Sequence, residues 1–106
     1  MTVPVQPPAV SPVSLVATTA TLTNVASSAT SVTIAAANTA RKGIYVYNDS
    51  TQTLFLSFSA VASSSSYVVQ IPTASFWEMP VPPVYTGLIT GIWVSANGNA
   101  RVTELS

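Results

Sequence analysis

Few residues of this chain could act as acids, bases or nucleophiles. The sequence has no histidine and no cysteine, and its carboxylates are Asp49, Glu78 and Glu104. A serine nucleophile needs a neighbouring base, and for the four serines at 63–66 the one candidate is Lys42, in a Ser–Lys dyad. Glycoside hydrolysis would require two of the carboxylates to converge on one bond. The spacing favours neither arrangement, and the sequence predicts a protein that is not an enzyme.

Bound metals and cofactors are not expected either. Zinc sites draw on cysteine and histidine ligands, which this chain lacks, and three dispersed carboxylates do not replace them. The four glycines are isolated from one another, so the sequence contains no glycine-rich phosphate loop. Asp49 lies in the stretch 48–51, whose side chains favour a turn, and we interpret it as a turn former.

Ionised side chains are scarce throughout the chain. They make up 6% of its 106 residues, and the formal net charge is zero, whereas ordinary domains carry about 25%. Three basic residues cannot build a phosphate-neutralising patch, so no nucleic-acid partner is expected. Ser, Thr or Pro interrupts every apolar run well before the roughly 18 residues of a membrane helix. No secretory signal is recognisable, and no membrane partner is expected.

With so few charged side chains, the surface of the protein must be covered either by uncharged polar side chains or by other proteins. Near-zero net charge promotes association, and we interpret the surface as one that is largely covered in an assembly. The alternative is a monomer coated with serine, threonine and asparagine side chains.

The elements that would position these residues are short strands. Residues 44–47 and 53–58 alternate in strand fashion around the turn 48–51, which predicts an antiparallel hairpin. Its inward side chains are predicted to form the core: Ile44, Val46, Leu54, Leu56 and Phe58. Its other face is predicted to meet a second layer or a partner: Tyr45, Tyr47 and Phe55.

The segments 15–17 and 21–23 could each form a short strand, and further strands are expected at 31–35, 67–71, 75–79, 86–95 and 101–105. Asn97-Gly98 predicts a type I′ turn that joins the last two as a second hairpin. Seven or eight short antiparallel strands with turns about every ten residues predict an all-β fold, either a β-sandwich or a jelly-roll-like barrel. We expect one β domain at 14–106.

Residues 1–13 are expected to form an extended N-terminal arm. Four prolines in this stretch exclude a helix or a central strand. The arm could be a free terminus, or it could lie on a neighbouring subunit through its valines, of which Val3, Val5 and Val10 are candidate contacts.

Two further features concern partners. Glu78 is predicted to pair with Arg41 or Arg101, either within the chain or across an interface. Trp77 and Trp93, with Tyr45 and Tyr85, could stack on sugar rings, which makes a carbohydrate-binding module one alternative. The other explanation is core and interface packing, where such residues are enriched.

Spaced motifs between residues 41 and 104 carry a resemblance to a known family. The most distinctive read Arg41-x-Gly43-Ile44-x-Val46-x-Asn48-x-Ser50 and Gly87-x-Ile89-x-Gly91-Ile92-Trp93. With Leu54-Phe55-Leu56, Phe76-x-Glu78-x-Pro80 and Ala96-Asn97-Gly98, they make residues 38–105 similar to small β-rich virion proteins of tailed bacteriophages, of the head decoration or cement type.

This resemblance implies a structural protein that binds and stabilises the lattice of the major capsid protein. It implies a homo-oligomer, commonly a trimer, on the capsid surface of a virion assembled in the bacterial host cytoplasm. A tail or head-fibre subunit is the alternative within the same class. The candidate interface residues are Val3, Val5, Val10, Tyr45, Tyr47, Phe55, Trp77 and Trp93.

Overall fold

A computed structural model describes residues 16–106, and the arm predicted at 1–13 lies outside the described residues. The described part contains eight strands and no helix, which confirms the all-β prediction. Consequently no helix suited to crossing a membrane is found in this part of the chain. The strands are β1 (Ala20–Ala26), β2 (Val32–Ala35), β3 (Gly43–Asp49), β4 (Leu54–Ser57), β5 (Val69–Ile71), β6 (Phe76–Glu78), β7 (Ile89–Trp93) and β8 (Asn99–Leu105).

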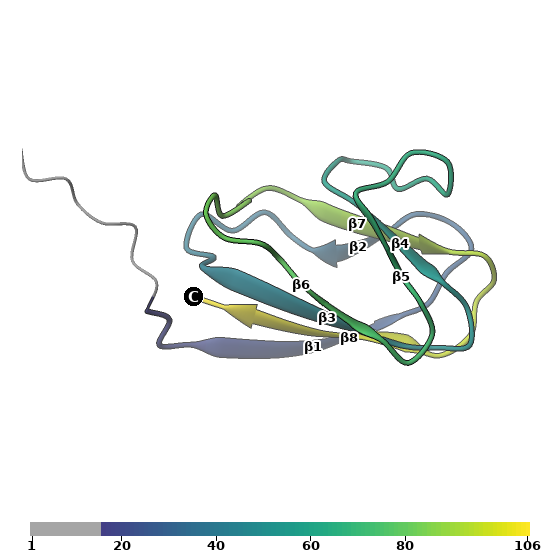
Figure 1. The fold of residues 1–106 in the computed structure, drawn as a ribbon, viewed down its shortest axis with the longest axis horizontal. Helices are drawn as coiled ribbons and strands as arrows, with labels where there is room; N and C mark the ends of the chain where they lie inside the picture. The colour runs from purple at the N-terminus through teal and green to yellow at the C-terminus, as the bar shows by residue number, and fades with distance from the viewer. Residues whose placement is uncertain (1–15) are drawn as a thin grey trace, which may run out of the picture.

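The strands form two antiparallel sheets that lie as two layers (Figure 1). Sheet 1 has the order β1-β8-β3-β6, and sheet 2 has the order β2-β7-β4-β5. The pairs β1·β8, β2·β7, β3·β6 and β4·β5 are nested, as in one long hairpin folded at β4–β5. Winding this ribbon alternates its pairs between the sheets, which is the jelly-roll form of the β-sandwich.

Side-chain alternation along the strands builds the core between the sheets. In β3, Ile44 and Val46 are buried while Tyr45 and Tyr47 point outward, as a period of two requires. The predicted core is confirmed at Ile44, Val46, Leu54 and Leu56, each at most 1% exposed. Phe58 is only partly buried and packs against the edge of this core.

Both predicted hairpins are wrong. β3 and β4 belong to different sheets, and so do β7 and β8, so each connection is a corner that crosses the sandwich. β3 has β8 on one side and β6 on the other, which leaves no free edge for β4. A short polar link with turn residues suits a corner as well as a hairpin, and the choice depends on partners distant in sequence.

Asn48 holds the corner between β3 and β4 together. Its side chain is fully buried, and its Nδ2 donates to the carbonyl oxygens of Gln52 at 2.7 Å and Ile71 at 2.8 Å. Its Oδ1 accepts a 3.1 Å hydrogen bond from Nε1 of Trp93. One carboxamide therefore links the end of β3 in sheet 1 to β5 and β7 in sheet 2.

We expect Asn48→Ala to lower the free energy of unfolding by about 2–3 kcal/mol, because it leaves a buried indole N–H and two carbonyl groups without their hydrogen-bond partner. Urea denaturation measures the change. The control is Asn97→Ala, since Asn97 is exposed and accepts one bond of 3.3 Å from the Thr51 amide; we expect a change within about 0.5 kcal/mol. Equal losses in the two variants would contradict this role of Asn48.

Candidate functional site

The most buried charged group of the described chain is Arg41, which is 2% exposed. Its Nε lies 2.8 Å from Oε2 of Glu104. Its remaining nitrogens donate to three carbonyl oxygens, those of Tyr85 at 2.8 Å, Gly87 at 2.9 Å and Ala36 at 2.7 Å. Arg41 therefore fastens β8 to the segments that flank β2 and β7, and its role is structural.

The predicted pairing of Glu78 with Arg41 or Arg101 does not form within the described residues. Arg41 pairs with Glu104, and Arg101 pairs with Asp49 at 2.8 Å on the surface. The reason is the strand order, because β8 lies beside β3. Glu104 of β8 therefore lies near Arg41, which precedes β3, and Arg101 of β8 lies near Asp49 at the end of β3. Glu78 sits on the other side of β3, opposite Tyr45, and is exposed. Its pairing across an interface stays a prediction.

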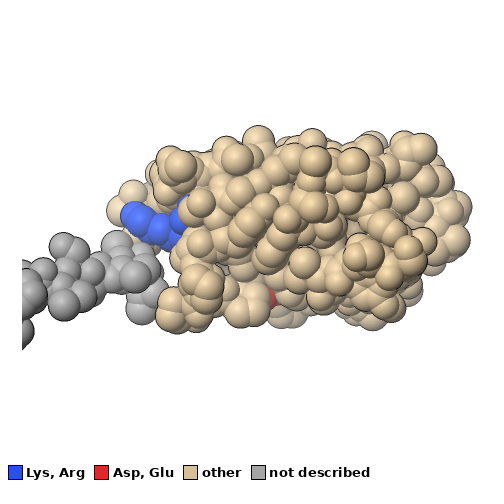
Figure 2. All heavy atoms as spheres, turned by 90° about the horizontal axis from the view of Figure 1, so that it is seen from above, with Lys and Arg blue, Asp and Glu red and all other residues tan. Residues whose placement is uncertain are grey.

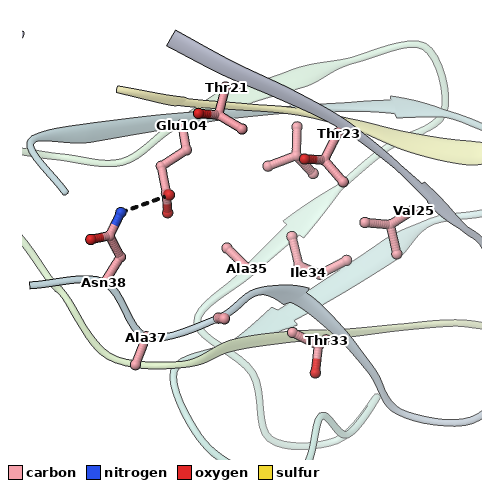
Figure 3. Close-up of a pocket in the computed structure, with 11 residues that line it drawn as sticks. Thr21, Thr23, Val25, Thr33, Ile34, Ala35, Ala37, Asn38 and Glu104 are labelled. Carbon is pink, nitrogen blue, oxygen red and sulfur yellow. Dashed lines mark hydrogen bonds between the residues drawn. The ribbon is translucent and has the colours of Figure 1, made fainter. Parts of the chain in front are cut away.

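Glu104 lines a hollow in the surface, and both of its carboxylate oxygens accept hydrogen bonds. The hollow opens between β1 and β2, has a volume of about 470 Å³, and is lined mainly by threonine and alanine. Figure 3 shows the Glu104 side chain reaching Asn38, whose Nδ2 donates to Oε1 at 2.9 Å. Arg41 occupies Oε2. Two side chains of the same chain therefore hold the carboxylate of Glu104 in place.

The other candidate catalytic groups do not come together among the described residues. Lys42 lines a hollow beside β3 and β6 that contains none of the serines at 63–66. Ser63 instead bonds Ser65 within its own loop. No group of three or more acidic residues able to hold a metal ion occurs between residues 16 and 106. Within residues 16–106, no contact between Lys42 and these serines is found that would form the Ser–Lys dyad.

Large side chains gather instead on the outer face of sheet 1. The register places Leu22, Thr103, Tyr45 and Glu78 in one row across the four strands, and Asn24, Arg101, Tyr47 and Phe76 in the next. Leu22 is 76% and Phe76 67% exposed, and the two tyrosines are 36% and 39% exposed. We call this surface the aromatic face and define it by Leu22, Tyr45, Tyr47 and Phe76.

The opposite outer face, that of sheet 2, is partly covered by the chain itself, while Thr33 of β2 and Gln70 of β5 are exposed on it. The 58–68 connection folds back over it, and Ser59 accepts a 2.9 Å hydrogen bond from Thr90 through its carbonyl oxygen. Tyr67 packs on Phe55 with ring centroids 5.1 Å apart. Thr90 and Ser57 are buried as a result. Among the described strands, the outer face of sheet 1 is the one that carries large exposed apolar side chains, and Asp49, Glu78 and Arg101 lie on it as well.

A second apolar feature is a groove at the edge where β5 and β6 end the two sheets. It has a volume of about 490 Å³. The Phe58 and Tyr85 rings stack in it at 4.3 Å with an angle of 5° between their planes, and Trp77 tilts against Phe58 at 6.1 Å. We call this the apolar groove; its lining residues are Phe58, Val68, Val69, Trp77, Met79, Pro80, Pro83 and Tyr85.

The groove is poorly equipped to bind a sugar. Its lining has no carboxylate, carboxamide or cation, and the Tyr85 hydroxyl already lies 3.0 Å from the Leu88 carbonyl oxygen and 3.3 Å from that of Phe58. Ligand sites of that kind need polar groups that fix orientation. The groove suits an apolar ligand instead.

The predicted interface residues fall into five groups. Tyr45 and Tyr47 do face outward on sheet 1, while Phe55 lies under Tyr67. Trp77 lines the apolar groove. Trp93 was misplaced, since it is 1% exposed and belongs to the core; the alternation of β7 turns it inward toward Asn48. Val3, Val5 and Val10 lie outside the described residues.

Sequence reasoning missed Phe76, Leu22 and the stacking of Phe58 on Tyr85. Alternation in 76–78 could have placed Phe76 opposite Trp77, because neighbouring side chains of a strand point to opposite faces. The Phe58–Tyr85 contact joins residues far apart in sequence, so no local sequence pattern predicts it.

Figure 2 shows a face with few charged side chains, where blue atoms gather near one end and red atoms barely show. Comparison with protein-family models, with curated proteins and with solved structures finds no match to this chain.

Proposed function

We propose that this chain is a non-enzymatic structural subunit of a tailed-bacteriophage virion, a decoration or cement protein of the capsid surface. The observation that carries the proposal is the aromatic face, an uncovered sheet surface with exposed Leu22, Phe76 and two tyrosines. Exposed apolar patches of this kind mark interaction sites, and tyrosine and phenylalanine are enriched at protein interfaces.

The partner of the aromatic face in this proposal is the major capsid protein. The face contains one pair of opposite charges, Arg101 with Asp49, whose side chains are 47% and 49% exposed, and also the exposed carboxylate of Glu78 beside Tyr45. Because Arg101 and Asp49 compensate each other, Glu78 is the charge on this face that a partner has to match or leave in water. The jelly roll is also a fold used in viral capsids, although a fold alone does not specify a function, and the motif resemblance of residues 38–105 points the same way.

The direct test is to locate the protein in virions. We expect mass spectrometry of purified particles to detect the chain, and electron microscopy to place it on the outer surface of the head as an oligomer, with a trimer expected. Density at the tail or on head fibres would support the alternative of a tail or fibre subunit. Absence of the protein from purified virions would overturn both.

Phe76→Ser is expected to weaken binding to phage heads assembled without this protein by about tenfold or more, as for a central apolar contact residue. Co-sedimentation with such heads measures the affinity. Val94→Ser is the matched control, because Val94 is 65% exposed, close to the 67% of Phe76, and lies after β7 in sheet 2. Equal affinities of the two variants would show that the aromatic face does not contact the head.

A further inference from the structure

The apolar groove has the chemistry of a receptor for proline-rich chain. Grooves that bind such segments are lined by aromatic rings, against which proline rings pack, and they gain from the low conformational entropy of the ligand. Here three aromatic residues, Phe58, Trp77 and Tyr85, share one groove with Pro80 and Pro83. The stacked rings of Phe58 and Tyr85, 4.3 Å apart, are held by the hydrogen bonds of the tyrosine hydroxyl.

The chain carries a segment that matches this groove. Residues 1–13 read Met-Thr-Val-Pro-Val-Gln-Pro-Pro-Ala-Val-Ser-Pro-Val, with four prolines, four valines and no charged side chain. A segment of this length in polyproline conformation spans about 40 Å. Since the groove lining has no ionised group, the uncharged arm can enter it without leaving a charge unpaired in the contact.

The root of the arm and the groove lie at opposite edges of sheet 1. The amides of Thr18 and Thr19 both donate to the carbonyl oxygen of Ser106 at 2.8 Å, which fixes the root beside β1 and the C-terminus. The groove lies beside β6, at the far end of the order β1-β8-β3-β6. If the arm of one copy leads away from the β1 edge, the β6 edge of an adjacent copy can receive it, and such head-to-tail contacts close into a ring when the rotation permits.

We propose that the apolar groove binds the proline-rich segment 1–13 of a second copy of this chain. The contact joins subunits to one another, whereas the aromatic face is left for the capsid. The inference extends the self-association contained in the proposed function, but it requires no capsid. A failure to bind phage heads therefore leaves it standing, and a failure of the arm contact leaves the aromatic face untouched.

Disulfide trapping tests the contact in the full-length protein, which has no cysteine of its own. One protein carries Val5→Cys in the arm, and a second, of altered mass, carries Val68→Cys at the groove, where Val68 is 51% exposed. After mixing and mild oxidation, we expect the heterodimer at about tenfold or more above a control with Val94→Cys in place of Val68→Cys, since binding raises the effective concentration of the two thiols.

Each result of the trapping experiment decides the question. Equal heterodimer yields with Val68→Cys and Val94→Cys mean that the arm does not occupy the groove. A chain carrying both Val5→Cys and Val68→Cys tests the other geometry. If that chain closes on itself while the mixture stays at control level, the arm lies in its own groove, and the second-copy contact is wrong.

A measurement without cysteines gives an independent check. Val68→Asp places a charge at the groove, and we expect it to lower the association constant of the protein with itself by a factor of about ten or more. Analytical ultracentrifugation measures this constant. Val94→Asp serves as the matched control, and far-UV circular dichroism confirms that both variants are folded. Association of Val68→Asp equal to that of Val94→Asp would overturn the proposal.

Discussion

Replacing Arg41 by alanine is expected to lower the free energy of unfolding by about 3–5 kcal/mol, the usual cost of removing one partner from a buried ion pair. The variant would leave Glu104 without its partner at 2.8 Å, and three carbonyl oxygens would lose the hydrogen bonds that the guanidinium now donates to them. A domain of this size is stable by only about 5–15 kcal/mol, so the loss is a large share of the total. Thermal and urea denaturation measure it.

The surface pair supplies the matched control for Arg41. Arg101 bonds Asp49 at 2.8 Å, the same distance as Arg41 to Glu104, but its side chain is 47% exposed. Exposed ion pairs contribute about 0–1 kcal/mol, so Arg101→Ala should change the stability by no more than this. Comparable losses in Arg41→Ala and Arg101→Ala would show that burial does not set the importance of the Arg41 network.

Gly98→Ala is expected to destabilise the fold by about 3 kcal/mol or more, because two costs combine. Gly98 has a φ of 79°, in the left-handed region that side chains disfavour. A Cβ there would also lie 2.2 Å from the backbone oxygen of Asp49 and 2.9 Å from the Cα of Ser50. Those are backbone atoms at the end of β3, so they cannot rotate away as a side chain could. Urea denaturation measures the loss.

Gly43→Ala is the control, since it makes the same substitution at the other end of β3. Its Cβ would lie 3.6 Å from Cδ1 of Leu105, an ordinary contact. We expect its stability to stay within about 1 kcal/mol of the unsubstituted protein. If Gly98→Ala is equally mild, the close approach of the β7–β8 corner to β3 is not important for stability.

These residues explain how a chain with so few charges still specifies one structure. Three residues, Arg41, Asn48 and Gly98, act at places where the ribbon changes sheet or where segments distant in sequence meet. Arg41 and Asn48 satisfy buried carbonyl groups there, and Gly98 permits a close backbone approach. Surface charges are therefore not needed to fix the fold, and a surface poor in charge remains open to contact with other proteins.

The sequence by itself determined the all-β class, a count of about eight strands, and the inward face of β3 and β4. These follow from alternation, a local property that holds whichever strand pairs with which. Ile44 and Val46 could therefore be placed in the core, and Tyr45 and Tyr47 on the other face, without a structure. The depletion of charge predicts an association surface but cannot say which face, and that surface stays a prediction.

The tertiary structure alone decided which sheet each strand joins, and several predictions depended on that choice. Asn48–Thr51 and Asn97-Gly98 became corners because β3 pairs with β8 and β6, both distant in sequence. The arrangement of the strands also brings Arg41 next to Glu104, leaves Glu78 exposed, and places Trp93 where its Nε1 donates a hydrogen bond to Asn48. Long-range pairing is chosen by the burial of the whole ribbon, and a turn signal of four residues cannot encode that choice.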